Sequence, residues 1–102
     1  MYNVILIRAD GSIERSQQTK KPEYEQIKKA VAGFIQIVPH LSKMEDYKRG
    51  EAYVNEEGLI HGLPFNQKAT EIWLENLGKG PFSYEPRLFG DMLYIAKEPK
   101  VK

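Results

Sequence analysis

Residues 55–66, Asn-Glu-Glu-Gly-Leu-Ile-His-Gly-Leu-Pro-Phe-Asn, contain the signals for a tight turn, a short strand, a bend and a helix start. Asn55 and Gly58 occupy the first and last positions of a four-residue turn, where type I turns favour these residue types. Short apolar segments flank the turn on both sides. The stretch therefore predicts a hairpin in which residues 51–54 pair with residues 59–61.

The second half of this stretch predicts the start of a helix. Gly62 and Pro64 bend the chain, and Asn66 is a favourable N-cap residue. Apolar residues then recur with helical spacing on one face, at Ala69, Trp73 and Leu77. We therefore expect a helix over residues 67–77, with Gly78 at its C-terminal end.

The chain before residue 55 predicts a hairpin, a helix and a strand. The β-branched run at residues 4–8 is followed by Asp10-Gly11, which is typical of a hairpin turn. Tyr24, Ile27 and Val31 then form an apolar stripe with helical spacing, and Gly33 is placed to end this helix in the left-handed conformation. Residues 34–38 follow as a strand.

Residues 88–96 complete the predicted elements as a final strand. The order β-β-α-β-β-β-α-β predicts an α+β fold. We expect a mainly antiparallel sheet of about five to six strands with two helices packed on one face. Residues 1–97 are interpreted as a single domain and residues 98–102 as a frayed basic tail.

The composition sets limits on function. The chain has 102 residues, 15 basic and 14 acidic side chains, and no cysteine. Overall charge therefore favours neither a nucleic-acid binder nor an acidic tail, and cysteine-based chemistry is excluded. No apolar run approaches the roughly 20 residues that cross a bilayer, so we expect no membrane association.

Three segments resemble one family of small proteins. Residues 33–39, Gly-Phe-Ile-Gln-Ile-Val-Pro, resemble a Gly-Gly-Tyr-Ile-Glu-Val-Val-Pro strand of that family. Residues 55–66 are similar to its Asn-Glu-Glu-Gly…Gly-Leu-Pro-x-Asn segment, and residues 88–95 occupy the place of its final strand. The family is the domain of unknown function 3846, encoded by phages, plasmids and conjugative elements. The resemblance implies action in the cytoplasm of a bacterial host, and it transfers no catalytic residue.

Our leading hypothesis is a non-enzymatic module that binds and modulates a host or phage protein. The absence of a catalytic or cofactor motif motivates it, and we predict no cofactor and no metal site. The side chains in the 55–66 segment that folding does not explain are Glu56, Glu57, His61 and Phe65. An exposed edge strand would also favour a homodimer.

Two alternatives come from other functional classes. The first is nucleic-acid binding through basic residues on and before the first helix and in the loop after residue 41, namely Lys21, Lys28, Lys29, Lys48 and Arg49. The second is a small-ligand binder or enzyme centred on His61 and Asn66, because histidine titrates near neutrality. The ordinary interpretation of His61 is a solvent-facing side chain.

Overall fold

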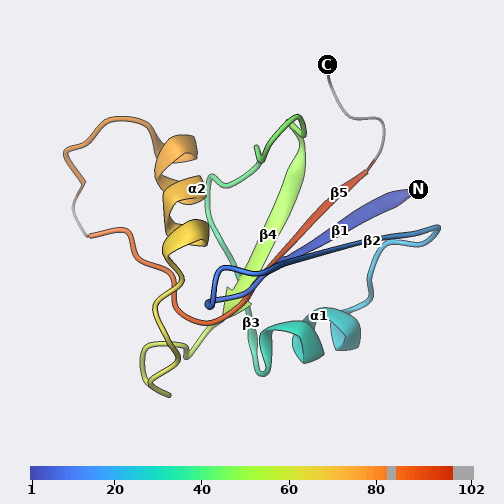
Figure 1. Ribbon diagram of the computed structural model, residues 1–102, viewed down its shortest axis with the longest axis horizontal. Coiled ribbons are helices and arrows are strands. Elements are labelled where there is room, and N and C mark those ends of the chain that lie inside the picture. The colour runs from blue at the N-terminus through green and yellow to red at the C-terminus, as the bar shows by residue number, and fades with distance from the viewer. Residues whose placement is uncertain (83–84, 98–102) are drawn as a thin grey trace.

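A computed structural model describes residues 1–82 and 85–97, so the predicted basic tail at residues 98–102 lies outside the described residues. The fold is α+β, as predicted, with one antiparallel sheet in the order β2-β1-β5-β4-β3 (Figure 1). The strands are β1 (Tyr2–Ile7), β2 (Ile13–Gln18), β3 (Ile35–Ile37), β4 (Gly50–Asn55) and β5 (Met92–Lys97). The helices are α1 (Tyr24–Val31) and α2 (Gln67–Leu77).

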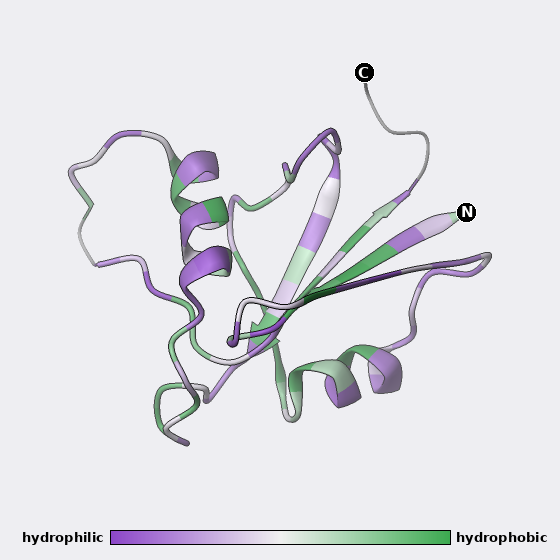
Figure 2. Ribbon diagram, in the orientation of Figure 1, coloured by the Kyte–Doolittle hydropathy of each residue, from purple (hydrophilic) through white to green (hydrophobic). Residues whose placement is uncertain are grey.

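The first hairpin is confirmed. β1 pairs with β2 along its whole length, from Tyr2 opposite Gln18 to Ile7 opposite Ile13. The Asp10 carboxylate accepts the Ser12 backbone N–H at 2.8 Å and so fixes the turn. Figure 2 shows hydrophobic residues on β1 and mainly polar ones on β2, because β1 is central and β2 forms an edge of the sheet.

The two helices cover opposite faces of the sheet, so the prediction that both pack on one face is wrong. Val4 of β1 belongs to a core cluster with Ile27 and Val31 of α1. Its neighbour Ile5 belongs to the other cluster, with Trp73 of α2. Successive side chains of a strand point to opposite faces, and β1 and β5 are apolar at nearly every position. Both faces therefore need a cover.

The segment between β3 and β4 completes the core beneath α2. Four of its side chains are buried against this helix and the sheet, namely Val38, Leu41, Met44 and Tyr47. The indole Nε1–H of Trp73 donates to the Pro39 carbonyl at 2.8 Å and so ties α2 to this segment.

The turn at Asn55–Gly58 forms, but the predicted strand at residues 59–61 does not. The Gly58 N–H donates to the Asn55 carbonyl at 3.2 Å, and residues 56–62 continue as successive turns. The reason is that β3 and β5 already occupy the two edges of β4. Residues 59–61 therefore cannot pair with β4 as the hairpin prediction required.

The helix ends differ in how well they were predicted. Helix α2 has the predicted bounds, and the Asn66 side chain accepts the Ala69 N–H at 3.0 Å. At the end of α1, Ala32 rather than Gly33 adopts the left-handed conformation, with φ of 60°. Gly33 is required for a different reason, because a Cβ atom there would overlap the amide of Asn55.

Candidate functional site

Exposed apolar residues occur at β3 and in the segment that follows β4. We name Phe34, Ile37, Leu59, Ile60 and Phe65 together the β3-edge surface. Their exposed fractions are 56% for Phe34, 53% for Ile37, 67% for Leu59, 82% for Ile60 and 44% for Phe65. Leu59 lines one groove with Gln36 of β3, so the two segments adjoin there. Single exposed apolar residues are ordinary, whereas a group of them is typical of an interaction surface.

The outer backbone of β3 is available for pairing. Phe34 accepts a hydrogen bond from the Glu56 N–H, and the Val38 N–H donates to Ala52, each at 2.8 Å. Backbone direction alternates along an antiparallel strand, so the N–H and C=O groups of Ile35 and Ile37 point away from β4. β3 is the last strand of the sheet, and these groups therefore form an open edge.

A small groove runs along one side of this edge. It has a volume of about 180 Å³ and is lined in part by Gln36, Leu59, Arg87 and Phe89. Gln36 points to the α2 face of the sheet, whereas Ile37 points to the α1 face, because successive side chains of a strand alternate. The edge of β3 thus has the groove on one side and the exposed Ile37 on the other.

The predicted residue Phe65 is held at this surface by packing. Its ring meets that of Phe89 edge-on, with centroids 5.9 Å apart, and the two residues also form a backbone bridge. The Arg87 guanidinium lies 5.8 Å from the centre of the Phe89 ring. A well-packed aromatic ring that stays partly exposed is a suitable anchor for a protein partner.

The other three predicted residues lie in the turns beside this surface. The Nε2 of His61 lies 2.8 Å from the Glu57 carboxylate, and both side chains are substantially exposed. Glu56 is exposed, and its backbone N–H bonds to Phe34. Glu57 and His61 pair with each other and so support the turn. The exposed apolar side chains are therefore the stronger candidates for contact with a partner.

The structure separates His61 and Asn66, the two residues on which the alternative of a small-ligand binder or enzyme is centred. Asn66 is fully buried, and its Nδ2 donates to the carbonyls of Ile7 at 2.9 Å and Gly90 at 2.8 Å. With its Oδ1 bonded to Ala69, this side chain is committed to the fold, whereas His61 is exposed. Within residues 1–82 and 85–97, no three His, Asp or Glu side chains cluster as a metal site would require.

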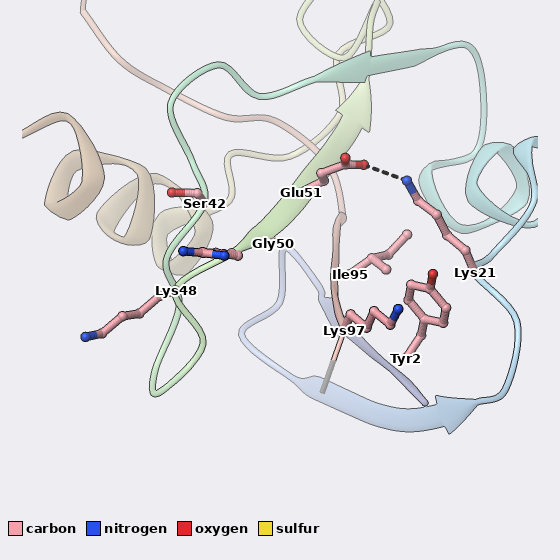
Figure 3. Close-up of a pocket in the computed structure, with 9 residues that line it drawn as sticks. Tyr2, Lys21, Ser42, Lys48, Gly50, Glu51, Ile95 and Lys97 are labelled. Carbon is pink, nitrogen blue, oxygen red and sulfur yellow. Dashed lines mark hydrogen bonds and ion pairs between the residues drawn. The ribbon is translucent and has the colours of Figure 1, made fainter. Parts of the chain in front are cut away.

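A second candidate site, the basic hollow, gathers part of the predicted nucleic-acid set. It has a volume of about 440 Å³, and its aromatic and charged lining residues are Tyr2, Lys21, Lys48, Arg49, Glu51 and Lys97. Figure 3 shows Tyr2, Ile95 and Lys97 side by side, with Lys21 reaching toward Glu51 and Lys48 extending outward. The predicted Lys28 and Lys29 lie on α1 instead, where the Lys28 ammonium sits 5.0 Å from the centre of the Phe34 ring.

Hydrogen bonding fixes the charge of the acid in this hollow. Glu51 accepts from the Tyr53 hydroxyl and pairs with Lys21 at 3.2 Å. These contacts, first with Tyr53 and then with Lys21, lower the pKa of the Glu51 carboxyl below its ordinary value. The carboxylate is therefore ionised at neutral pH and offsets Lys21.

The chain belongs to a recognised family. Residues 1–100 match the family described as Domain of unknown function (DUF3846), so the chain is a member of it. This confirms the resemblance drawn from its three segments. Searches of curated proteins and of solved structures gave no match. None of the described helices has the length and apolar character needed to cross a membrane.

Several residues of these surfaces were missed in the sequence. Leu59 and Ile60 were assigned to a strand, where apolar residues are expected to pack rather than to be exposed. Glu57 and His61 are four residues apart, a spacing that allows side chains to pair across a helical turn but not along a strand. This spacing was the available signal that the segment forms turns rather than a strand. Lys97 joins Lys21 and Arg49 only through the strand order, which the linear sequence does not reveal.

Proposed function

We propose that the protein is a non-enzymatic binding module that captures an extended segment of a partner protein along the open edge of β3. The observation that carries the proposal is that the outer backbone groups of Ile35 and Ile37, which no described strand pairs, occur together with the exposed apolar side chains of the β3-edge surface. Backbone bonds at such an edge provide affinity, and adjoining pockets provide specificity.

The geometry on the two sides of β3 suits an added strand. A strand laid along Ile35 and Ile37 would point alternate side chains to the two faces of the sheet. On the α2 face they would meet the groove lined by Leu59 and Phe89. On the α1 face they would meet Ile37. We therefore expect the partner segment to be extended and to carry apolar residues on both sides.

The opposite edge of the sheet is a poorer docking site. β2 is six residues long, and apart from Ile13 its side chains are polar. Arg15 forms a salt bridge with Glu45, and Glu14 forms one with Arg8 at 2.7 Å. Charged and polar side chains on an edge strand discourage strand addition. This contrast favours β3 as the binding edge.

The biological setting of the proposal comes from the family resemblance. A protein encoded by a phage or another mobile element would act in the cytoplasm of the bacterial host, and the captured partner would be a host or phage protein that it modulates. The neighbouring genes provide a direct check. Genes for conjugation, replication or evasion of host defence beside this one would support that setting, whereas a purely metabolic neighbourhood would contradict it.

The binding test uses a backbone variant and a side-chain variant. Ile37→Pro removes an outward N–H and keeps the bonds that face β4, so the fold should persist while strand addition is blocked. Ile60→Glu places a charge on the most exposed apolar residue of the surface. Leu74→Glu is the matched control, because Leu74 is an exposed apolar residue on α2. Circular dichroism verifies the fold of each variant.

The measurement identifies the partner by photo-crosslinking from position 60 and then follows amide exchange in the purified complex. The proposal expects the Ile35 and Ile37 amides to gain protection, and expects Ile37→Pro and Ile60→Glu to weaken binding while Leu74→Glu does not. A complex in which those two amides exchange as fast as in the free protein would refute it. Protection that rises with the concentration of the protein alone would show that the occupant is a second copy of the chain.

A further inference from the structure

The basic hollow lies on the α1 face of the sheet, at the end where β1 starts and β5 ends. Tyr2 is opposite Lys97 in the sheet, and Ile95 is opposite Glu51, so all four side chains point to this face. Lys21 reaches it from the segment before α1, and Arg49 from the loop before β4. These segments lie far apart in the sequence and line one hollow, and Figure 3 shows Tyr2, Lys21 and Lys97 drawn around the same space.

The charge of the hollow is concentrated in a nearly neutral protein. Four basic side chains, those of Lys21, Lys48, Arg49 and Lys97, line it, and Glu51 is the one carboxylate among its described lining residues. The Glu51 carboxylate forms an ion pair with Lys21 and accepts a hydrogen bond from the Tyr53 hydroxyl. In the part of the chain that the structure describes, Lys48, Arg49 and Lys97 form no ion pair. The whole chain has a net charge of only +1, so this excess is local.

We infer that the basic hollow binds closely spaced phosphate groups, such as those of a single-stranded nucleic acid. Arg49 offers the planar fork of donors that matches phosphate oxygens, and the lysines add mobile point charges. Tyr2 provides an aromatic ring on which a base could stack, which is how single strands are commonly held beside a basic track. A free oligophosphate shares the phosphate chemistry but makes no use of the ring.

The structure also supplies a matched control for this site. Lys29 is an exposed lysine on α1, outside the hollow, and it belongs to the set that the sequence predicted. Arg49→Glu, Lys97→Glu and Lys29→Glu change the net charge by the same amount. Only the first two place a negative charge in the hollow, so a general electrostatic effect and a local site are distinguishable.

The experiment measures the fluorescence anisotropy of labelled oligo(dT) of about 20 nucleotides with the full chain, at about 50 and 200 mM salt. We expect binding that weakens with salt. Arg49→Glu and Lys97→Glu should each raise Kd about ten-fold or more and reduce the salt slope by about one, whereas Lys29→Glu should change Kd by less than about three-fold.

Competition by inorganic pyrophosphate and by poly-glutamate identifies the anion. Stronger displacement by unlabelled oligo(dT) than by pyrophosphate supports a nucleic-acid strand, and equal displacement supports a site for free oligophosphate. Tyr2→Leu should weaken oligo(dT) binding and leave pyrophosphate competition unchanged if the ring stacks on bases. Equal loss of binding in Lys29→Glu, equal competition by poly-glutamate, or absence of salt-dependent binding would overturn the inference.

Discussion

The side-chain amide of Asn55 lies against Gly33, in the space that a Cβ atom at position 33 would fill. Its Nδ2 donates to the carbonyls of Val31 at 3.2 Å and Ala32 at 3.1 Å. These are carbonyls at the end of α1, which have no partner within the helix. One buried asparagine at the end of β4 therefore closes helix α1 and starts the turn at Glu57, whose N–H it accepts at 2.8 Å.

Gly33→Ala should destabilise the protein by about 1–3 kcal/mol, because the added methyl group displaces a buried side chain from its hydrogen bonds. The measurement is urea unfolding followed by circular dichroism. In an Asn55→Ala background the same substitution should cost at least about 0.5 kcal/mol less, since the overlap is gone. Strictly additive effects of the two substitutions would show that the contact is not the cause.

Asn66→Asp separates two roles of the buried residue before α2. The substitution keeps an oxygen to cap the Ala69 N–H but removes the donor to the carbonyls of Ile7 and Gly90. We expect a loss of about 2–4 kcal/mol in the free energy of unfolding, because the side chain is buried and faces two acceptors. Loss of a helix cap alone costs about 1 kcal/mol. A loss of that size or less would show that the hydrogen bonds from Asn66 to Ile7 and Gly90 contribute little to stability.

We expect ionisation of Tyr94 to lower the stability of the fold at alkaline pH. It is fully buried, and its hydroxyl donates to the Ser42 carbonyl at 2.8 Å. Burial, with a smaller contribution from Tyr47, raises the pKa of Tyr94 from 10.0 to about 12. The neutral form is favoured in the fold, so this contribution is complete below about pH 10 and is lost as pH rises toward 12.

The check is the thermal unfolding midpoint from about pH 8 to pH 11.5 in the parent chain and in Tyr94→Phe. The phenylalanine variant has no hydroxyl to ionise, so its midpoint should fall less steeply above about pH 10. Tyr53 is present in both proteins, and burial and the Glu51 contact raise its pKa as well. Parallel pH curves for the two proteins would exclude Tyr94 as the group responsible.

Trp73→Phe should cost about 1–2 kcal/mol, because it removes the hydrogen bond to Pro39 while keeping an aromatic ring in the core. Trp73→Ala should cost about 3–5 kcal/mol, since it also leaves a cavity beneath α2. Trp73 is the only tryptophan, so neither variant retains tryptophan fluorescence. Chemical denaturation is therefore followed by circular dichroism in both variants. Equal losses in the two variants would show that packing contributes little.

Local patterns predicted the elements whose causes are local. The bounds of α2 followed from the Asn66 cap and the helical spacing of its apolar residues, and the first hairpin followed from Asp10-Gly11. The left-handed position at the end of α1 was assigned to Gly33 and is held by Ala32. That assignment was wrong because the glycine at position 33 is required by its close contact with Asn55, which is 22 residues away in the sequence.

The chain by itself determined the α+β class, the family and most of the helices and turns, because short-range hydrogen bonds and residue spacing specify them. Tertiary structure decided which edges of β4 were occupied, and hence that Leu59 and Ile60 remain exposed instead of forming a strand. It also placed α1 and α2 on opposite faces and brought Lys21, Arg49 and Lys97 together. Strand pairing joins residues far apart in the chain, and no local pattern encodes which strands become neighbours.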